Sequence, residues 1–235
     1  MKACVVGYGA MGKIVCDLLK EELAYPVGLE CEYKELNETD KNFDVIIDFS
    51  NPANLDMIYN FAIENKKPVV FATTGYTDEQ IAKIYELAKH VPVLRSANFS
   101  LGVILINRLV KEITPILKDD FDIEIIEAHH HNKVDAPSGT AKMLLKSVVD
   151  STGFTPVYGR DGYQPRKPNE VGVHAVRGGS IVGNHDVVFA GTDEVLTLSH
   201  SAGSKKIFAL GAIKAARFII EKNIGLYDME DVLFN

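Results

Sequence analysis

"KACVVGYGAMGKIVCDLL", residues 2–19, decides the fold of the first part of this chain. A β-branched apolar run is followed by a glycine-rich turn and then by apolar residues at the spacing of one helix face, which predicts strand, tight turn and helix. Gly7, Gly9 and Gly12 form the pattern G-x-G-x-x-G across this turn. The first glycine permits the turn, the second lets a pyrophosphate approach the backbone, and the third lets helix and strand pack closely. The stretch therefore predicts a dinucleotide-binding turn.

A carboxylate at the end of the next expected strand, "YPVGLEC", supports this interpretation. Glu30 stands where a carboxylate can hydrogen-bond the ribose hydroxyls of an adenosine. Cys31 follows it in place of an arginine that would bind a 2′-phosphate, and Glu32 adds local repulsion. We expect NADH as the cofactor, with NADPH as the alternative. Three ordinary turn glycines and a surface glutamate would be the interpretation without a ligand.

Three more apolar stretches, "DVIIDFS", "KPVVFATTG" and "VPVLRSA", alternate with helical patterns. Continuous apolar strands that alternate with helices predict a parallel sheet covered on both faces. The turns "ATTG" and "SANF" follow the last two strands, at the carboxyl edge where ligands bind open α/β sheets. Small and hydroxylated residues there suit the nicotinamide half of a dinucleotide, although an ordinary turn explains any one of them equally well.

The pattern changes after Ser100. A long apolar helix near residues 103–117 leads into "FDIEIIEA", whose alternation predicts a half-buried strand of an antiparallel or mixed sheet. Strand-like stretches follow at "VGVHAVRG", "HDVVFAG" and "EVLTLSH", before a helix near residues 206–222. We predict an α/β protein with a Rossmann-like parallel-sheet domain and an α+β domain for substrate binding and oligomerisation. The expected boundaries are 1–99 for dinucleotide binding, 100–205 for the second domain, and 206–235 for a C-terminal helix that returns to the first domain.

Composition sets the remaining limits. The 235 residues are 46% apolar and 24% charged, with a formal net charge of −7 and no block of like charges, so neither nucleic acid nor an anionic membrane is an expected partner. Cys4, Cys16 and Cys31 lack the spacing of a zinc or redox site, which favours a reducing compartment. The sequence shows no signal peptide and no apolar run approaching the ~20 residues of a membrane span, so we expect a cytoplasmic protein.

The densest group of ionisable residues is "EAHHHNKVDAPSGTA", residues 127–141. His129, His130 and His131 are consecutive, and successive side chains of an extended chain point to opposite sides, so the three cannot converge on one ion without a turn. No cysteine lies nearby, and we expect no metal. A solvated polar loop is a second alternative, but it does not explain why a strand delivers these groups directly before a capped helix.

A reaction centre explains the segment better. Histidine titrates near neutrality and lysine carries a proton, so His129 and Lys133 suit proton transfer to a substrate that gains a hydride. Pro137 and Ser138 open the next helix, where the backbone amides of the first turn favour an anion such as a carboxylate. The segment would supply a proton and a carboxylate site, and the first domain would supply the hydride.

This segment resembles the motif of the 4-hydroxy-tetrahydrodipicolinate reductases, also called dihydrodipicolinate reductases. The family motif has the form E-[AL]-H-H-x-x-K-x-D-A-P-S-G-T, and residues 127–140 match it throughout. The likeness extends through "AMG", "DFSNP", "ATTG", "SANFS", "VRGGSIVGNH" and "GTDEVLTLSH", over almost the whole chain. The sequence departs from the family in a glycine turn one residue shorter than in many members, in Asn184 within "GNH" where "GEH" is commoner, and in Cys31 where arginine is frequent. These departures concern cofactor preference and not the reaction.

The resemblance implies reduction of (2S,4S)-4-hydroxy-2,3,4,5-tetrahydrodipicolinate to 2,3,4,5-tetrahydrodipicolinate with NADH or NADPH and loss of water, in the diaminopimelate route of lysine biosynthesis. By motif position, His129 would donate or accept one proton, Lys133 would donate the second, and the substrate would be bound by His130, Gly139 and Thr140. The implied dinucleotide contacts are Gly7, Tyr8, Gly9, Ala10, Met11, Gly12, Glu30, Ala72, Thr73, Thr74, Ser96, Ala97, Asn98 and Phe99. The family fold is a cofactor domain plus a substrate domain whose sheet builds a homotetramer.

Two other functions remain open at this level. An NAD-dependent amino-acid dehydrogenase of similar two-domain build would share the fold, which by itself does not decide the function. A dinucleotide-binding redox sensor would need the glycine turn and Glu30 but not the pair of His129 and Lys133. The histidine motif therefore weighs against both.

Overall fold

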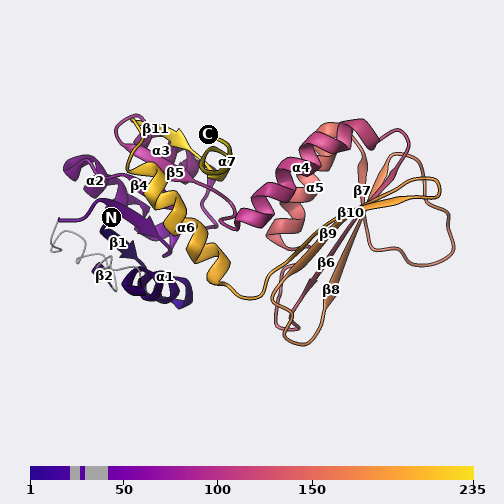
Figure 1. Ribbon diagram of the computed structural model, residues 1–235, viewed down its shortest axis with the longest axis horizontal. Coiled ribbons are helices and arrows are strands. Elements are labelled where there is room, and N and C mark those ends of the chain that lie inside the picture. Colours follow the sequence, from indigo (N-terminus) through magenta and orange to yellow (C-terminus); the bar gives the residue numbers. More distant parts are fainter. Residues whose placement is uncertain (22–26, 30–41) are drawn as a thin grey trace. The chain divides into compact units, whose positions relative to one another are not determined.

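The parallel sheet expected for the first part of the chain is present in a computed structural model that describes residues 1–21, 27–29 and 42–235 (Figure 1). Its six strands lie in the order β11-β5-β4-β3-β1-β2, and every neighbouring pair is parallel. The strands are β1 (Ala3–Val6), β2 (Val27–Leu29), β3 (Val45–Asp48), β4 (Val69–Phe71), β5 (Pro92–Arg95) and β11 (Gly225–Tyr227). Strands β1, β3 and β4 are fully buried between the helices, and they consist of nearly continuous apolar residues.

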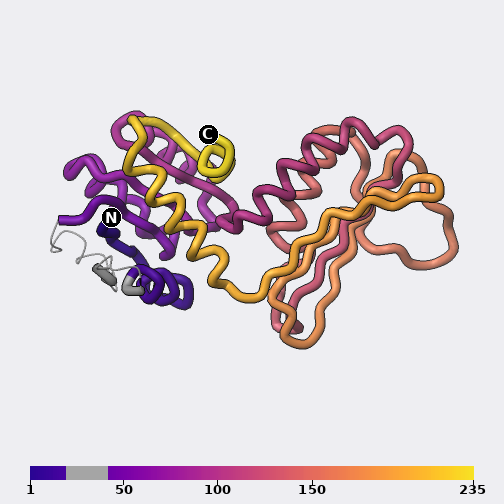
Figure 2. Tube along the Cα trace, in the orientation of Figure 1, coloured from indigo at the N-terminus to yellow at the C-terminus, as the bar shows by residue number. Residues whose placement is uncertain are grey.

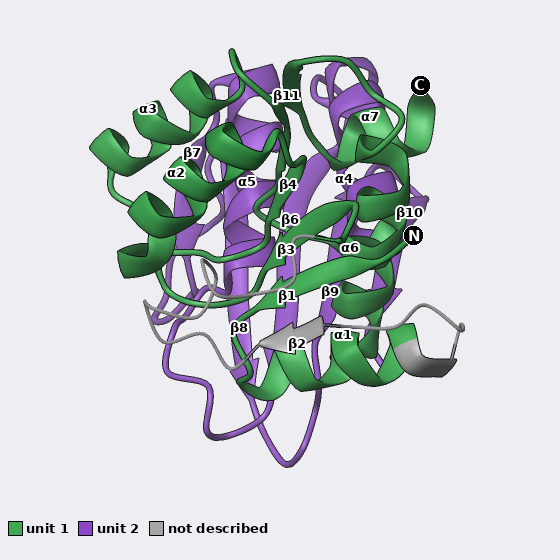
Figure 3. Ribbon diagram, turned by 90° about the vertical axis from the view of Figure 1, so that its left-hand side faces the viewer, with its two compact units in different colours: residues 1–101, 206–235 green, residues 102–205 purple. Residues whose placement is uncertain are grey.

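Helices cover both faces of this sheet (Figure 3). Helices α2 (Leu55–Asn65) and α3 (Asp78–Leu87) share a core with one face, and α6 (Lys206–Ile219) contacts α1 (Ala10–Glu21) together with strands β3, β4 and β5. A 3₁₀ turn, η1 (Pro52–Asn54), precedes α2. The C-terminal part of the chain returns to the first part (Figure 2), and together residues 1–101 and 206–235 form one compact unit, called unit 1.

The strand order places the glycine turn at a defined point of unit 1. Strand β1 lies between β2 and β3. The chain therefore adds β2 on one side of β1 and then β3 on the other side, so the strand order reverses at β1. Ligands of open α/β sheets bind at this reversal of strand order, outside the carboxyl ends of the strands. The turn that follows β1 begins at Gly7 and therefore lies where a dinucleotide is expected.

Residues 102–205 form the second compact unit, unit 2, around a five-stranded mixed sheet in the order β10-β9-β6-β8-β7. Strand β6 pairs parallel with β8 and antiparallel with β9, so of the two expected alternatives, antiparallel or mixed, the sheet is mixed. Two helices cover one face, and alternate residues of β6 are buried against them. The elements are α4 (Leu101–Leu117), β6 (Asp122–His129), α5 (Gly139–Thr152), β7 (Thr155–Tyr158), β8 (Glu170–Arg177), β9 (Asn184–Ala190) and β10 (Val195–Ser201).

The sequence did not reveal three short elements. Strand β7 has only one apolar branched residue, Val157, and strand β11 is only Gly-Leu-Tyr. Each depends on pairing with a neighbouring strand, β8 or β5, and not on a pattern of its own. The third element, α7 (Met229–Phe234), begins with a capping box at Asp228. In addition, α6 ends at Ile219, and residues 220–222 form turns instead of continuing the helix.

None of the helices in the described ranges is both long enough and apolar enough to span a membrane.

Candidate active site

The glycine turn of unit 1 has the geometry that its sequence predicts. Gly7 has a φ of 96°, and a Cβ atom there would lie 2.4 Å from the carbonyl oxygen of Phe49. A Cβ atom on Gly12 would lie 1.8 Å from the carbonyl oxygen of Gly7, because α1 packs directly on the turn. At Gly9, in contrast, a Cβ atom would meet nothing within 4 Å. The first and third glycines are thus required by the fold, and the second leaves open space above the backbone.

The other expected dinucleotide residues lie at the same carboxyl edge of the sheet but differ in exposure. Tyr8, Ala10, Thr74 and Ala97 are exposed, Met11, Ala72 and Ser96 are half-buried, and Thr73, Asn98 and Phe99 are buried. The Thr73 hydroxyl accepts a hydrogen bond from the Ser50 amide at 2.8 Å, and the Asn98 side chain accepts one from the Ser100 amide at 2.8 Å. Through these hydrogen bonds, Thr73 and Asn98 hold the backbone of the loops at this edge. Glu30 and Cys31 lie outside the described residues.

A buried polar cluster that sequence reasoning missed supports this edge. The Asp48 side chain is fully buried, and its carboxylate accepts hydrogen bonds from the hydroxyls of Ser50 at 2.5 Å and Tyr76 at 2.8 Å. Burial raises the pKa of Asp48, and these hydrogen bonds oppose that effect. The cluster ties together the loops that follow β3 and β4. Its sequence signal is "DFSNP", which is informative only as part of the family likeness.

In unit 2, strand β6 delivers Glu127 and His129 to the face covered by the helices. The strand continues through His129, two residues beyond Glu127, so the two side chains point the same way. The His129 residue is only 8% exposed, and its Nδ1 atom lies 2.6 Å from Oε2 of Glu127. A turn follows, in which the Lys133 amide donates to the His130 carbonyl at 3.1 Å. His130 is half-buried and His131 is exposed.

Glu127 is the centre of the polar contacts in this region. Its side chain is 0% exposed and pairs with the guanidinium of Arg177, with Nη1 2.8 Å from Oε2 and Nη2 2.7 Å from Oε1. The Ser138 amide also donates to Oε1, at 3.0 Å. Burial alone would raise the pKa of Glu127, but the hydrogen bonds from Arg177, His129 and Ser138 outweigh it, and the pKa lies below its usual range. Sequence spacing gave no indication that Arg177 lies beside Glu127.

Lys133 is held by a partner in its own loop. Its Nζ atom lies 2.6 Å from Oδ1 of Asp135, and the hydrogen bond from Lys133 is the main reason why the pKa of Asp135 lies below its usual range. The charge of Lys133 also contributes to lowering the pKa of His185, which contacts the ring of His129 edge-on at a centroid distance of 5.1 Å. Lys133 and His129 therefore act on the same region of unit 2.

The N-terminus of α5 completes the region. Ser138 is its N-cap: the hydroxyl accepts a hydrogen bond from the Ala141 amide at 3.2 Å. The same hydroxyl lies 2.9 Å from Nε2 of His185. Gly139, which is exposed, and Thr140, which is half-buried, form the first turn of the helix. Because Glu127 binds the Ser138 amide, the helix terminus and the His129 ring are anchored to one carboxylate.

In the described part of the chain, no group of three or more His, Cys, Asp and Glu side chains could hold a metal ion.

We expect His185 to make the stability of unit 2 depend on pH. Burial, and then proximity to His129, lower the pKa of His185 from 6.5 to about 4. The unfolded chain therefore binds a proton at His185 more readily than the folded chain does. Neutral His185 favours the folded state fully above pH ~6.5, and this contribution to stability is lost as the pH falls toward ~4. The titration of His185 alone should lower the free energy of unfolding by roughly 2 kcal/mol between about pH 7.5 and pH 5.

Urea denaturation at the two pH values measures this effect. His185→Gln should remove about that much of the pH dependence, and His131→Gln, at an exposed histidine, should leave it unchanged. An equal pH dependence in the wild type and in His185→Gln would show that His185 is not buried in its neutral form.

Comparison with known proteins places the chain in a family. The model of "Dihydrodipicolinate reductase, N-terminus" matches residues 1–99, and that of "Dihydrodipicolinate reductase, C-terminus" matches residues 102–233. The chain belongs to the dihydrodipicolinate reductase family. A 4-hydroxy-tetrahydrodipicolinate reductase of Clostridium novyi is 48% identical over 215 residues, which are 91% of this chain and 83% of the relative. One from Brachyspira hyodysenteriae is 43% identical over 237 residues, covering 99% and 100% of the two chains.

The fold agrees with a solved member of the dihydrodipicolinate reductase family. A dipicolinate-bound dihydrodipicolinate reductase from Paenisporosarcina sp. TG-14 matches 99% of this chain and 100% of its own, with a TM-score of 0.78 at 24% identity. At that identity the match shows the fold alone, and it confirms the predicted α/β class with a Rossmann-like first domain. The match to the N-terminal domain of this reductase family implies a nicotinamide dinucleotide as the cofactor.

Proposed function

We propose that the chain reduces (2S,4S)-4-hydroxy-2,3,4,5-tetrahydrodipicolinate to 2,3,4,5-tetrahydrodipicolinate with NADH or NADPH, in lysine biosynthesis through diaminopimelate. The observation that carries this proposal is the histidine motif of unit 2 in a chain whose two parts both match the reductase family. The relatives are named 4-hydroxy-tetrahydrodipicolinate reductase, which is the enzyme of this reaction. The solved relative is bound to dipicolinate, a dicarboxylate, which fits a dicarboxylate substrate.

The residues of unit 1 fit the cofactor that the family implies. The open space above Gly9 admits a pyrophosphate, and the first turn of α1 directs backbone amides and the positive end of the helix dipole toward it. A bound nicotinamide supplies the hydride. The exposed and half-buried residues at the same edge, Thr74, Ser96 and Ala97, would contact the dinucleotide beyond the turn.

The residues of unit 2 would handle protons and substrate. His129, oriented by Glu127, would donate or accept one proton, and Lys133 would donate another from its ion pair with Asp135. The first turn of α5, at Gly139 and Thr140, would bind a substrate carboxylate, with His130 beside it. In the overall reaction the substrate would gain one hydride and one proton, and its hydroxyl group would leave as water together with one hydrogen from the ring, so the net uptake is a single proton.

A direct assay tests the proposal. The protein is mixed with NADH or NADPH and with the condensation product of pyruvate and aspartate semialdehyde, and nicotinamide absorbance is followed. We expect absorbance to fall only when protein and condensation product are both present. Failure to oxidise either cofactor would exclude the proposed reaction.

We expect NADH to serve at least as well as NADPH. Glu30 would bind the ribose hydroxyls, and Cys31 offers no positive charge for a 2′-phosphate. Glu30→Ala should weaken NADH binding by about tenfold, equivalent to about 1.4 kcal/mol, and Glu64→Ala, at an exposed glutamate of α2, should not. Strong NADPH preference combined with binding that survives Glu30→Ala would place the ribose site elsewhere.

We also propose that unit 2 mediates assembly into a homotetramer. Strand pairing places three exposed apolar side chains, Ile126, Val176 and Val195, on the sheet face that α4 and α5 do not cover, with exposed fractions of 38%, 49% and 66%. Such a face favours association with other copies. Sedimentation at micromolar concentration should show a tetramer, and Ile126→Glu should shift it to smaller species. Ile116→Glu, on the exposed side of α4, is the control, and a wild type that sediments only as a monomer would contradict the proposal.

A further inference from the structure

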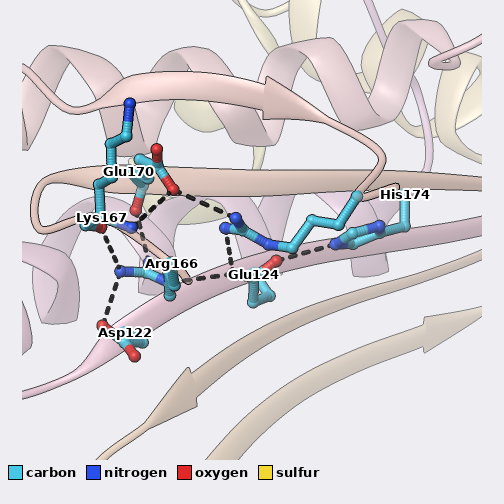
Figure 4. A network of polar contacts seen from close by, with 7 residues as sticks. Asp122, Glu124, Arg166, Lys167, Glu170 and His174 are labelled. Carbon is cyan, nitrogen blue, oxygen red and sulfur yellow. Dashed lines mark hydrogen bonds and ion pairs between the residues drawn. The ribbon is translucent and has the colours of Figure 1, made fainter. Parts of the chain in front are cut away.

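Strand β6 carries two glutamates on opposite faces of the sheet, and each of them contacts one histidine and at least one arginine. Glu127 faces the helices and contacts His129 and Arg177, and its carboxylate is fully buried. Glu124 faces the other side, where Nε2 of His174 lies 2.9 Å from Oε2 and Arg166 and Arg160 also contact the carboxylate (Figure 4). Only the first group belongs to the histidine motif. The second provides a matched comparison within the same strand.

The contacts of Glu127 determine which nitrogen of His129 carries the proton. All other partners of the carboxylate are donors, namely two N–H groups of Arg177 and the amide of Ser138. An ionised carboxylate accepts hydrogen bonds and cannot donate one, so Nδ1 of His129 must donate across the 2.6 Å contact. In the neutral ring, Nε2 is then the nitrogen that can accept a proton, and in the charged ring it can donate one.

The opposite edge of the ring is kept open by a glycine. A Cβ atom on Gly183 would lie 2.9 Å from Nε2 of His129. Any larger residue at this position would press on the nitrogen that remains available for proton transfer. Glu127 thus holds one edge of the ring, and the absence of a side chain at Gly183 leaves room for the other edge.

Glu127 also controls the N-terminus of α5, because Oε1 accepts from the Ser138 amide while Oε2 contacts His129. The guanidinium of Arg177 binds both oxygens and also donates to the Asp135 carbonyl at 2.6 Å, so the carboxylate cannot rotate without breaking several bonds. The position of the ring relative to the start of the helix is therefore set by one side chain.

We infer that Glu127, clamped by Arg177, is a positioning residue that holds His129 as the Nδ1–H tautomer and sets its place relative to the N-terminus of α5. This inference rests on the proposed function, because it assigns the cause of the orientation of the proposed proton-transfer group. The lowered pKa of Glu127 supports it, since the carboxylate stays ionised at neutral pH. The charged or titratable groups that contact the pair include Arg177 on β8 and His185 on β9. In the loop, the carbonyl of Asp135 binds Arg177, and the charge of Lys133 acts on His185.

Glu127→Gln makes a specific change. At either oxygen position, the NH₂ group of glutamine would face a donating N–H group of Arg177. At the Oε1 position it would face a second donor as well, the Ser138 amide. It should therefore occupy the Oε2 position, facing Nδ1 of His129. Nδ1 must then accept, and the ring should change to the Nε2–H tautomer. Glu124→Gln, on the other face, should leave His129 unchanged.

The tautomer is measured by ¹⁵N–¹H correlation spectra of ¹⁵N-histidine-labelled protein, with the His129 signals assigned by their loss in His129→Gln. We expect neutral His129 to be protonated on Nδ1 in the wild type and in Glu124→Gln, and on Nε2 in Glu127→Gln. A wild-type spectrum with the proton on Nε2 would overturn the inference. This spectrum requires no variant at position 127 to fold and no catalytic activity.

Kinetics separate positioning from a merely structural role. Glu127→Gln should lower kcat by roughly 10²- to 10⁴-fold, the scale of a misplaced general acid–base group, with KM changed by less than about threefold because Oε1 still holds Ser138. Glu124→Gln should keep kcat within about twofold. If kcat of a folded Glu127→Gln stays within about threefold of the wild type, the inference is wrong. If the wild type itself oxidises no cofactor, the proposed function fails while the spectra still decide the role of Glu127.

Discussion

Replacing His129 by Gln should lower kcat by roughly 10²-fold or more, with the affinity for NADH unchanged. Glutamine has a similar reach but has no group that takes up or releases a proton, so it can fill the space next to Glu127 without transferring a proton. His129 is only 8% exposed, and its Nδ1 atom is already engaged, which leaves Nε2 for the substrate. Steady-state rates and NADH titration of the same preparations measure the two quantities separately.

His131→Ala is the control for this result. His131 is exposed, and its backbone amide, which the substitution retains, bonds to the Gly179 carbonyl at 3.3 Å. We expect kcat of this variant to stay within about twofold of the wild type. If His131→Ala were as damaging as His129→Gln, or if chelators abolished activity, the histidines would be metal ligands and the proton-transfer role would be wrong.

The second large effect is expected in the glycine turn, where Gly12→Ala should destabilise unit 1 by about 3 kcal/mol or more and abolish measurable NADH binding. The added Cβ would lie 1.8 Å from the backbone oxygen of Gly7, and a backbone atom in a tight turn has no room to withdraw. Thermal or urea unfolding and NADH titration would show both losses together.

Gly9→Ala separates cofactor binding from folding. Its Cβ meets nothing within 4 Å, so stability should change by less than about 1 kcal/mol. The same methyl group would occupy the space that a pyrophosphate needs, and NADH should bind at least about tenfold more weakly. Equal NADH affinity in Gly9→Ala and the wild type would mean that the phosphates do not approach this turn.

Much of the fold could be predicted because its main elements carry their own patterns. Strands β1, β3 and β4 are nearly continuous apolar runs, and α4 and β6 show the periods of a helix and of a half-buried strand. Strands β7 and β11 carry no such pattern, since three or four residues become a strand only when a neighbour offers its edge. Their places follow from tertiary pairing, which the local sequence does not encode.

The candidate site divides in the same way. His129, Lys133 and the start of α5 are close in sequence, so the chemistry of the segment could be predicted from residue types and spacing. Arg177 and His185 come from β8 and β9, and they reach Glu127, His129 and Ser138 only because the register of the mixed sheet aligns these strands. The function of Glu127 as the common anchor thus depends on contacts distant in sequence.

The most direct measurement of the central claim is the fate of the hydride. NADH deuterated at both C4 positions is incubated with the protein and the condensation product of pyruvate and aspartate semialdehyde, and the product is analysed by mass spectrometry. We expect the substrate to lose water and to give a tetrahydrodipicolinate product that contains one deuterium for each NADH oxidised. NADH oxidation that leaves the product without deuterium, or no oxidation of NADH or NADPH at all, would contradict this claim.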